Sequence, residues 1–108
     1  MIGVDIISIA RIKNMKQKEA FVMRVLTPTE CETYDSFNDQ KRKDQWLAGR
    51  FAAKEAIIKA LLEDVNSYHD LTIDQIDKKT ICQYQGKTIF VSIAHEDDYA
   101  IAIAMISL

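Results

Sequence analysis

Hydrophobic and polar residues alternate at the start of the chain, which predicts a strand over residues 1–6. Ile2, Val4 and Ile6 fall on one face of this strand, and Gly3 and Asp5 fall on the other. Asp5 therefore points away from the aliphatic side chains. A carboxylate in an aliphatic strand is costly to bury unless it is paired or binds a cation.

After this strand, the hydrophobic residues recur every third or fourth position, which is the spacing typical of helices. Ile9, Ile12 and Met15 are spaced for one helical face, and residues 18–26 favour a second short helix. The residues TPTE at 27–30 predict the start of a third helix that ends near residues 36–39. In this motif the first threonine can cap the helix, the proline suits its first position, and the glutamate can bond back to the cap.

A long helix is predicted over residues 40–63. Its broad apolar stripe consists of Leu47, Phe51, Ile58 and Leu62, and small residues at Ala48, Ala52 and Ala56 allow another element to approach closely. Gly49 costs about 1 kcal/mol relative to alanine in a helix interior. We expect tight packing, by the first strand, to compensate this cost.

The last third of the chain predicts strands. They are expected at residues 71–77, 80–84, 88–95 and 99–106, with turns at 85–87 and 96–98. In the last strand large side chains alternate with alanines, so the alanine face leaves room for a helix. A strand, then helices, then antiparallel strands predict a single α+β domain over residues 1–108.

Composition and charge narrow the possible classes of protein. The 108 residues suit one domain of ordinary soluble composition, without an apolar run long enough to span a membrane or a secretory leader. Cys31 and Cys82 lack the spacing of metal ligands, so we expect reduced thiols and a cytoplasmic location. The net charge of −2 argues against non-specific nucleic-acid binding.

That net charge hides an asymmetry. Residues 1–24 carry five basic and two acidic residues, a balance of +3, whereas residues 61–108 carry three basic and eight acidic residues, a balance of −5. A basic N-terminal third favours an acidic partner.

Charged residues cluster on the long helix. Arg50 and Lys54 form one i, i+4 pair, and Glu55 and Lys59 form another. One interpretation is a solvated edge, on which the Glu55–Lys59 ion pair contributes only about 0.3–0.5 kcal/mol. In the other, Asp5 and Glu55 converge to bind Mg²⁺, which prefers oxygen ligands and phosphates, while the basic residues hold those phosphates. Asp5 could also cap its strand end or pair with Arg11.

Four segments together resemble a known family. They are GVDIISIARI, RVLTPTE, RKDQWLAGRFAAKEAIIKA and VSIAH, and they occur in the order and approximate spacing of holo-acyl-carrier-protein synthases. These are small 4′-phosphopantetheinyl transferases that act in fatty acid biosynthesis. The resemblance spans nearly the whole chain and is weakest between residues 62 and 88.

The resemblance implies a role for each matching residue. Asp5 and Glu55 match the family's Mg²⁺ ligands, and Lys59 matches a lysine near the pyrophosphate of coenzyme A; these three are the implied catalytic residues. The implied coenzyme-binding residues are Lys41, Arg42, Arg50, Lys54, Lys59 and His95. The implied carrier-protein-binding residues are Arg11, Lys13, Met15 and Arg24.

The implied reaction transfers the 4′-phosphopantetheine arm of coenzyme A to a serine of apo-acyl carrier protein and releases 3′,5′-ADP. It depends on Mg²⁺, and either a Mg²⁺-bound water or Glu55 could accept the serine proton. Members of the family are homotrimers that bind coenzyme A between neighbouring subunits. This suits a chain too small to enclose a coenzyme.

The chain departs from the family pattern after the long helix. Where members have a glycine-rich turn, it has Leu62, Glu63 and Asp64. The carboxylates of Glu63 and Asp64 would repel a pyrophosphate if they faced it. The alternatives are a divergent synthase, a catalytically silent trimeric paralogue that only binds acyl carrier protein, and a structural domain whose charged edge forms only ion pairs.

The sequence predicts the surroundings of three further side chains less precisely. His69 lies in a polar loop and is expected to be solvated surface. Trp46 and Tyr68 are expected to pack or to lie partly exposed, and either could contact an adenine.

Overall fold

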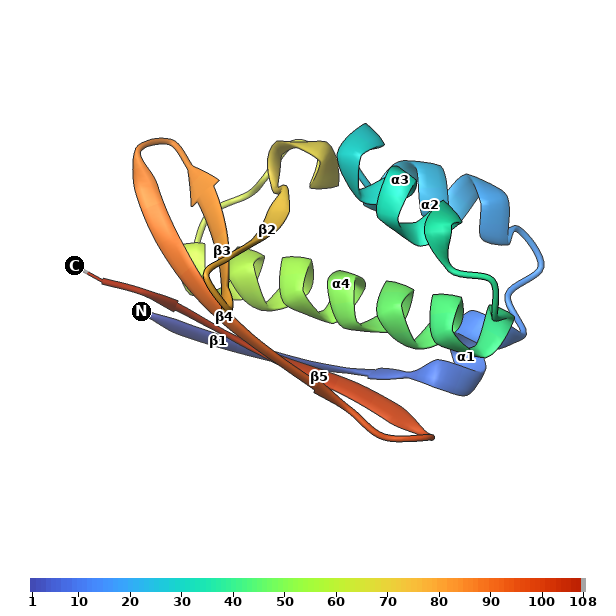
Figure 1. The fold of residues 1–108 in the computed structure, drawn as a ribbon. Helices are drawn as coiled ribbons and strands as arrows, with labels where there is room; N and C mark the ends of the chain where they lie inside the picture. The colour runs from blue at the N-terminus through green and yellow to red at the C-terminus, as the bar shows by residue number, and fades with distance from the viewer. Residues whose placement is uncertain (108) are drawn as a thin grey trace.

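A five-stranded antiparallel sheet forms one layer of the protein (Figure 1). The computed structural model describes residues 1–107. The strands are β1 (Ile2–Ser8), β2 (Ile73–Ile76), β3 (Lys79–Tyr84), β4 (Lys87–His95) and β5 (Tyr99–Ile106). Their order across the sheet is β1-β5-β4-β3-β2, so the first and last strands of the chain are neighbours. The predicted α+β class and all the predicted strands are confirmed.

The helices cover one face of this sheet. They are α1 (Ile9–Lys13), α2 (Lys18–Val25), α3 (Pro28–Ser36), α4 (Gln40–Leu61) and the short 3₁₀ helix η1 (Tyr68–Asp70). The long helix α4 lies along the sheet, and α2 and α3 lie on its far side (Figure 1). In residues 1–107 no helix is long and apolar enough to cross a membrane.

Small residues allow α4 to lie close to β1 and β5. Ala100, Ala102 and Ala104 are fully buried beneath the helix, as the alternation in the last strand predicts. In β1 a Cβ at Gly3 would lie 1.9 Å from the carbonyl oxygen of Ala56, so only glycine fits. This close approach fixes the position of Asp5, two residues along the same face of β1.

Gly49 packs against a different strand from the one predicted. A Cβ at this position would lie 3.0 Å from the side chain of Ile93, which belongs to β4. The contact between glycine and the first strand occurs instead at Gly3. Gly49 therefore brings α4 close to the strand that ends at His95.

The outer face of the sheet, which α4 does not cover, is apolar and exposed. Its large side chains are 39–71% exposed, and they are Ile2, Val4, Ile6, Phe90, Tyr99, Ile101, Ile103 and Met105. Single exposed apolar residues are normal on a protein surface, but a contiguous apolar patch marks an interaction site. The aliphatic side chains of the first strand thus face away from the core of the single chain.

The start of α3 is the capping box that the sequence predicts. The Thr27 side chain accepts a hydrogen bond from the Glu30 amide at 3.4 Å, and Glu30 Oε1 accepts one from the Thr27 amide at 2.9 Å. Both groups are buried. The cap therefore fixes the Glu30 carboxylate inside the protein, next to α4.

The end of α4 differs from the prediction. The helix ends at Leu61, and Leu62 has a φ of +55° in the left-handed region that glycine adopts most readily. Leu62 is 75% exposed, so it does not extend the apolar stripe. Glu63 and Asp64 are also exposed. Leu62 therefore ends the helix in a conformation that glycine favours, without being a glycine.

Candidate functional site

A cleft of about 1000 Å³ opens on one side of α4. Side chains from α4 and the end of β4 bring together four predicted coenzyme-binding residues in its lining, namely Lys41, Arg42, Arg50 and His95. Trp46 also lines it, so it lies in the position where it could contact a nucleotide base. A volume of this size is typical of small-molecule sites.

Arg50 is the most constrained cation of this cleft. Its Cζ lies 4.5 Å from the centre of the Trp46 ring, and its Nε is buried and has no hydrogen-bond partner among residues 1–107. Burial lowers the pKa of Arg50 from its ordinary value, and the nearby Glu30 carboxylate opposes that shift. Because Nε is buried, a phosphate in the cleft would have to bind the terminal guanidinium nitrogens, which the Trp46 ring holds in place.

A second set of polar side chains lies where β1, α4 and η1 meet. Lys59 Nζ donates to Asp5 Oδ1 at 3.2 Å and to the Val4 carbonyl at 3.0 Å. The Tyr68 hydroxyl donates to Glu55 Oε1 at 2.6 Å. Burial and the hydrogen bond to Glu55 raise the pKa of Tyr68 to about 12, and the negative charge of Asp5 adds a smaller contribution. We call Asp5, Glu55 and Lys59 the carboxylate cluster, and its binding of a metal stays a prediction.

The donor atoms of this cluster fit Mg²⁺ but do not by themselves form a complete metal site. Asp5 and Glu55 offer carboxylate oxygens, and residues 1–107 contain no group of three or more His, Cys, Asp or Glu that could hold a metal. Mg²⁺ is usually bound through one or two carboxylates together with substrate phosphates and waters. The pair therefore suits a cation that arrives with a phosphorylated substrate.

The two groups lie on different sides of α4. Successive helical residues are rotated by about 100°, so the Arg50 and Glu55 side chains project about 140° apart. Asp5 lies on the edge strand β1, and His95 lies on β4, with β5 between them. Among the described residues that line the cleft, Asp5, Glu55 and Lys59 are absent. The sequence places these charges near one another, whereas the fold separates them into two groups, the residues that line the cleft and the carboxylate cluster.

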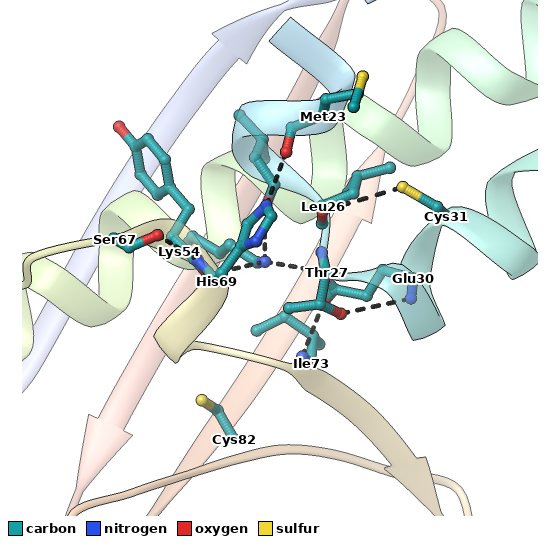
Figure 2. A network of polar contacts seen from close by, with 12 residues as sticks. Met23, Leu26, Thr27, Glu30, Cys31, Lys54, Ser67, His69, Ile73 and Cys82 are labelled. Atoms are coloured by element: carbon teal, nitrogen blue, oxygen red, sulfur yellow. Dashed lines mark hydrogen bonds and ion pairs between the residues drawn. The ribbon is translucent and has the colours of Figure 1, made fainter. Parts of the chain in front are cut away.

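Lys54 does not lie where the sequence predicts. Its side chain is fully buried, and its Nζ donates to Glu30 Oε1 at 2.6 Å, to the Val25 carbonyl at 2.6 Å and to the Tyr68 carbonyl at 3.1 Å (Figure 2). Burial lowers its pKa, while the Glu30 carboxylate opposes that shift. Because three acceptors use all three hydrogens of the ammonium, Lys54 has none left for a phosphate of coenzyme A. It is a structural residue in this arrangement.

The four predicted carrier-binding residues lie on the surface or close to it. Arg11, Lys13 and Arg24 are exposed, and Met15 is half-buried. The positive charge of Arg24 partly opposes the rise in the pKa of Tyr68.

The segment around η1 contains contacts that the sequence does not reveal. His69 is exposed, as predicted, but its Nε2 lies 2.6 Å from the Met23 carbonyl and therefore ties η1 to α2 (Figure 2). Tyr68 is half-buried against Phe51, which agrees with its prediction as a packing or partly exposed residue. No local motif indicates its bond to Glu55, because the two residues are thirteen positions apart across an irregular segment.

Comparison with known proteins identifies a family. The sequence model of the 4′-phosphopantetheinyl transferase superfamily matches residues 1–104. The holo-[acyl-carrier-protein] synthase of Staphylococcus saprophyticus is 42% identical over 106 residues and is matched over 94% of this chain and 91% of its own. That of Mycoplasma capricolum is 40% identical over 105 residues, with 96% and 91% of the two chains covered.

Solved structures agree with this relationship. The Bacillus anthracis holo-(acyl-carrier-protein) synthase, in complex with CoA (3′,5′-ADP), superimposes with a TM-score of 0.85 at 32% identity, covering 97% of this chain and 93% of its own. The Helicobacter pylori synthase, in complex with coenzyme A, has a TM-score of 0.83 at 31% identity, covering 99% and 100%.

Proposed function

This chain belongs to the 4′-phosphopantetheinyl transferase superfamily, within the holo-[acyl-carrier-protein] synthases, and on that premise we propose that it transfers the 4′-phosphopantetheine arm of coenzyme A to a serine of apo-acyl carrier protein. The observation that carries the proposal is the cluster of Asp5, Glu55 and Lys59 in a chain matched to the family over residues 1–104. The other product is 3′,5′-ADP.

The cleft, which we call the basic cleft for the cations in its lining although Glu30, Asp39 and Asp74 line it too, supports the binding of the nucleotide part of coenzyme A. Lys41, Arg42 and Arg50 offer cations to its phosphates, and Trp46 and His95 border the same space. Guanidinium groups bind phosphates through paired hydrogen bonds, which gives orientation as well as affinity. Lys54, which the fold buries, has no part in this proposed site.

Asp5 and Glu55 would hold the Mg²⁺ ion, which supplies charge stabilisation for phosphoryl transfer when it is bound. The serine hydroxyl gives its proton to a base, for which Glu55 is one candidate; its oxygen then forms a new bond to the β-phosphorus, and the bond from that phosphorus to the oxygen that bridges the two phosphates breaks. The electron pair leaves with that oxygen on 3′,5′-ADP. Lys59, whose side chain is 56% exposed at the edge of this cluster, can donate to the developing charge.

We further propose that each complete site forms between two copies of the chain in a homotrimer. Two observations support this arrangement. The two proposed half-sites, the cleft with Arg50 and the carboxylate cluster of Asp5, Glu55 and Lys59, lie on different sides of α4, and the outer face of the sheet is a large exposed apolar surface. A closed ring built through heterologous contacts would place one half-site of each chain against the other half-site of its neighbour. The free thiols of Cys31 and Cys82 are consistent with the cytoplasm as the place of this reaction.

A change of Ile103 to Asp should dissociate the trimer. Ile103 lies on β5 within the outer face and is 47% exposed in the single chain, so an interface there would bury an unpaired charge. We expect a monomer by light scattering on a sizing column, with transfer lost. Met23→Asp introduces the same charge at an exposed apolar residue on α2 and should leave the oligomer intact. An Ile103→Asp protein that remains a trimer would contradict an interface at the outer face of the sheet.

A change of Arg11 to Glu should weaken carrier recognition selectively. Arg11 is exposed on α1, outside the lining of the basic cleft, so reversing its charge acts on the docking of an acidic partner. We expect the KM for the carrier to rise by about tenfold or more, because a like-charge contact replaces an attractive one. The KM for coenzyme A should stay within about twofold of the parent value. An equal change in both constants would refute this division of roles.

One observation favours a second function, a catalytically silent trimer that only binds acyl carrier protein. Glu63 and Asp64 are exposed where the family has a glycine-rich turn, and they would repel a nearby pyrophosphate. Intact-mass analysis of apo-acyl carrier protein separates the two functions. After incubation with the protein, coenzyme A and Mg²⁺, we expect a gain of one phosphopantetheine arm that a chelator prevents. If the carrier gains no mass but still binds the protein on a sizing column, the proposed transferase function is overturned.

A further inference from the structure

Tyr68 touches the carboxylate cluster but belongs to none of the motifs that identify the family. Its hydroxyl donates to Glu55 Oε1 at 2.6 Å, and the bond bridges η1 and α4. Within residues 1–107 the other carboxylate oxygen, Oε2, makes no hydrogen bond. The Glu55 side chain is therefore fixed at one oxygen and open at the other.

The position of this phenol is itself determined by several contacts. The Tyr68 ring meets the Phe51 ring edge-on, with 5.8 Å between their centres. Its carbonyl accepts a hydrogen bond from the buried Lys54 at 3.1 Å, and the adjacent His69 ring lies 2.6 Å from the Met23 carbonyl. Contacts from both α4 and α2 thus hold the residue, so its hydroxyl is a fixed point rather than part of a mobile loop.

A fixed donor matters for Glu55 because a glutamate has three rotatable side-chain bonds. Left free, it would lose rotamer entropy each time it bound a cation. A hydrogen bond from a neighbouring residue to one carboxylate oxygen removes part of that cost and sets the direction of the other oxygen. Lys59 and Asp5 form the corresponding arrangement on the other carboxylate, at 3.2 Å.

We propose that Tyr68 is a positioning residue: its hydroxyl orients the Glu55 carboxylate for the divalent cation that Glu55 shares with Asp5. The inference rests on the proposed function, since that function assigns the cation to these two carboxylates. Tyr68 needs no contact with substrate in this role. The buried Lys54, which the sequence assigns to coenzyme binding, instead supports the backbone that carries the phenol.

The test is a titration with Mn²⁺, followed by electron paramagnetic resonance, in the presence of saturating coenzyme A. Tyr68→Phe removes only the hydroxyl and keeps the ring packed on Phe51. We expect the Mn²⁺ dissociation constant to rise by about tenfold, the usual size of such an outer-shell effect. Tyr84→Phe is the matched control, because the Tyr84 hydroxyl contacts Gln85 at an exposed site, and its Mn²⁺ affinity should match the parent.

A merely structural role for Tyr68 gives different results. Loss of packing would lower the melting temperature without a specific effect on the cation, whereas the positioning role predicts unchanged coenzyme A affinity and recovery of transfer at saturating Mn²⁺. Equal Mn²⁺ affinities in the parent and Tyr68→Phe would overturn this inference alone. A parent protein that binds no Mn²⁺ with coenzyme A would overturn the proposed metal site and this inference with it.

Discussion

Replacing Asp5 by Asn or Glu55 by Gln should reduce phosphopantetheine transfer by about 100- to 1000-fold, the usual effect of removing one group that stabilises charge in a transition state. Each substitution keeps the shape of the side chain and removes the negative charge that a divalent cation requires. The two residues lie on β1 and α4, which meet at the cluster containing Lys59 and Tyr68. The measurement is the rate at which apo-acyl carrier protein gains mass at saturating coenzyme A.

Both variants should remain folded, so the loss can be assigned to chemistry. The Asp5–Lys59 pair includes a side chain that is 56% exposed, and pairs of this kind stabilise a protein by less than about 1 kcal/mol. Circular dichroism and thermal melting check this expectation. Glu32→Gln, at an exposed carboxylate on α3, is the matched control and should transfer at the parent rate. Near-normal, Mg²⁺-dependent transfer by either variant would show that the site is assigned wrongly.

Replacing Lys54 by Met should lower the free energy of unfolding by about 3–5 kcal/mol, because it leaves the buried Glu30 carboxylate without its counter-charge. Lys54 is fully buried, and it joins the ends of α2 and η1 to α3 through its three acceptors. The Glu30 carboxylate also accepts from the amides of Thr27 and Ile73. Urea denaturation measures the change.

A double variant isolates the charge from the packing. Lys54→Met combined with Glu30→Gln removes both charges and keeps an oxygen acceptor at residue 30. We expect the double variant to be more stable than Lys54→Met alone, since no unpaired charge remains buried. A loss below about 1 kcal/mol for the single variant would place Lys54 among ordinary surface ion pairs and would reopen its predicted role at coenzyme A.

Local patterns predict the elements of this fold well. The alternation of Ala100, Ala102 and Ala104 predicts a strand face that receives a helix, and TPTE at residues 27–30 predicts the capping box that forms. Both signals depend on neighbours within a few positions along the chain. For the same reason they do not show which face of the first strand is covered. Ile2, Val4 and Ile6 are exposed in the single chain.

The errors concern contacts between distant residues. The sequence predicts that Lys54 belongs to a charged helix edge. It does not show the counter-charge of Lys54, because Glu30 lies 24 positions earlier in another helix. Gly49 packs on β4 rather than on the first strand, which depends on how the sheet is ordered. Tyr68 reaches Glu55 from an irregular segment without any sequence period. The motifs identify the candidate residues, but only the fold divides them into two half-sites.

Mixing two inactive variants tests most directly the claim that transfer needs a site built from two chains. Asp5→Asn disables the carboxylate half-site, and Arg50→Ala disables the basic cleft, so each protein alone should not modify the carrier. After the subunits are mixed and allowed to exchange, random assortment leaves both intact half-sites at about a quarter of the interfaces of a cyclic trimer. We predict that intact-mass analysis then shows about this fraction of the parent rate. No recovery, with subunit exchange demonstrated, would contradict the shared site.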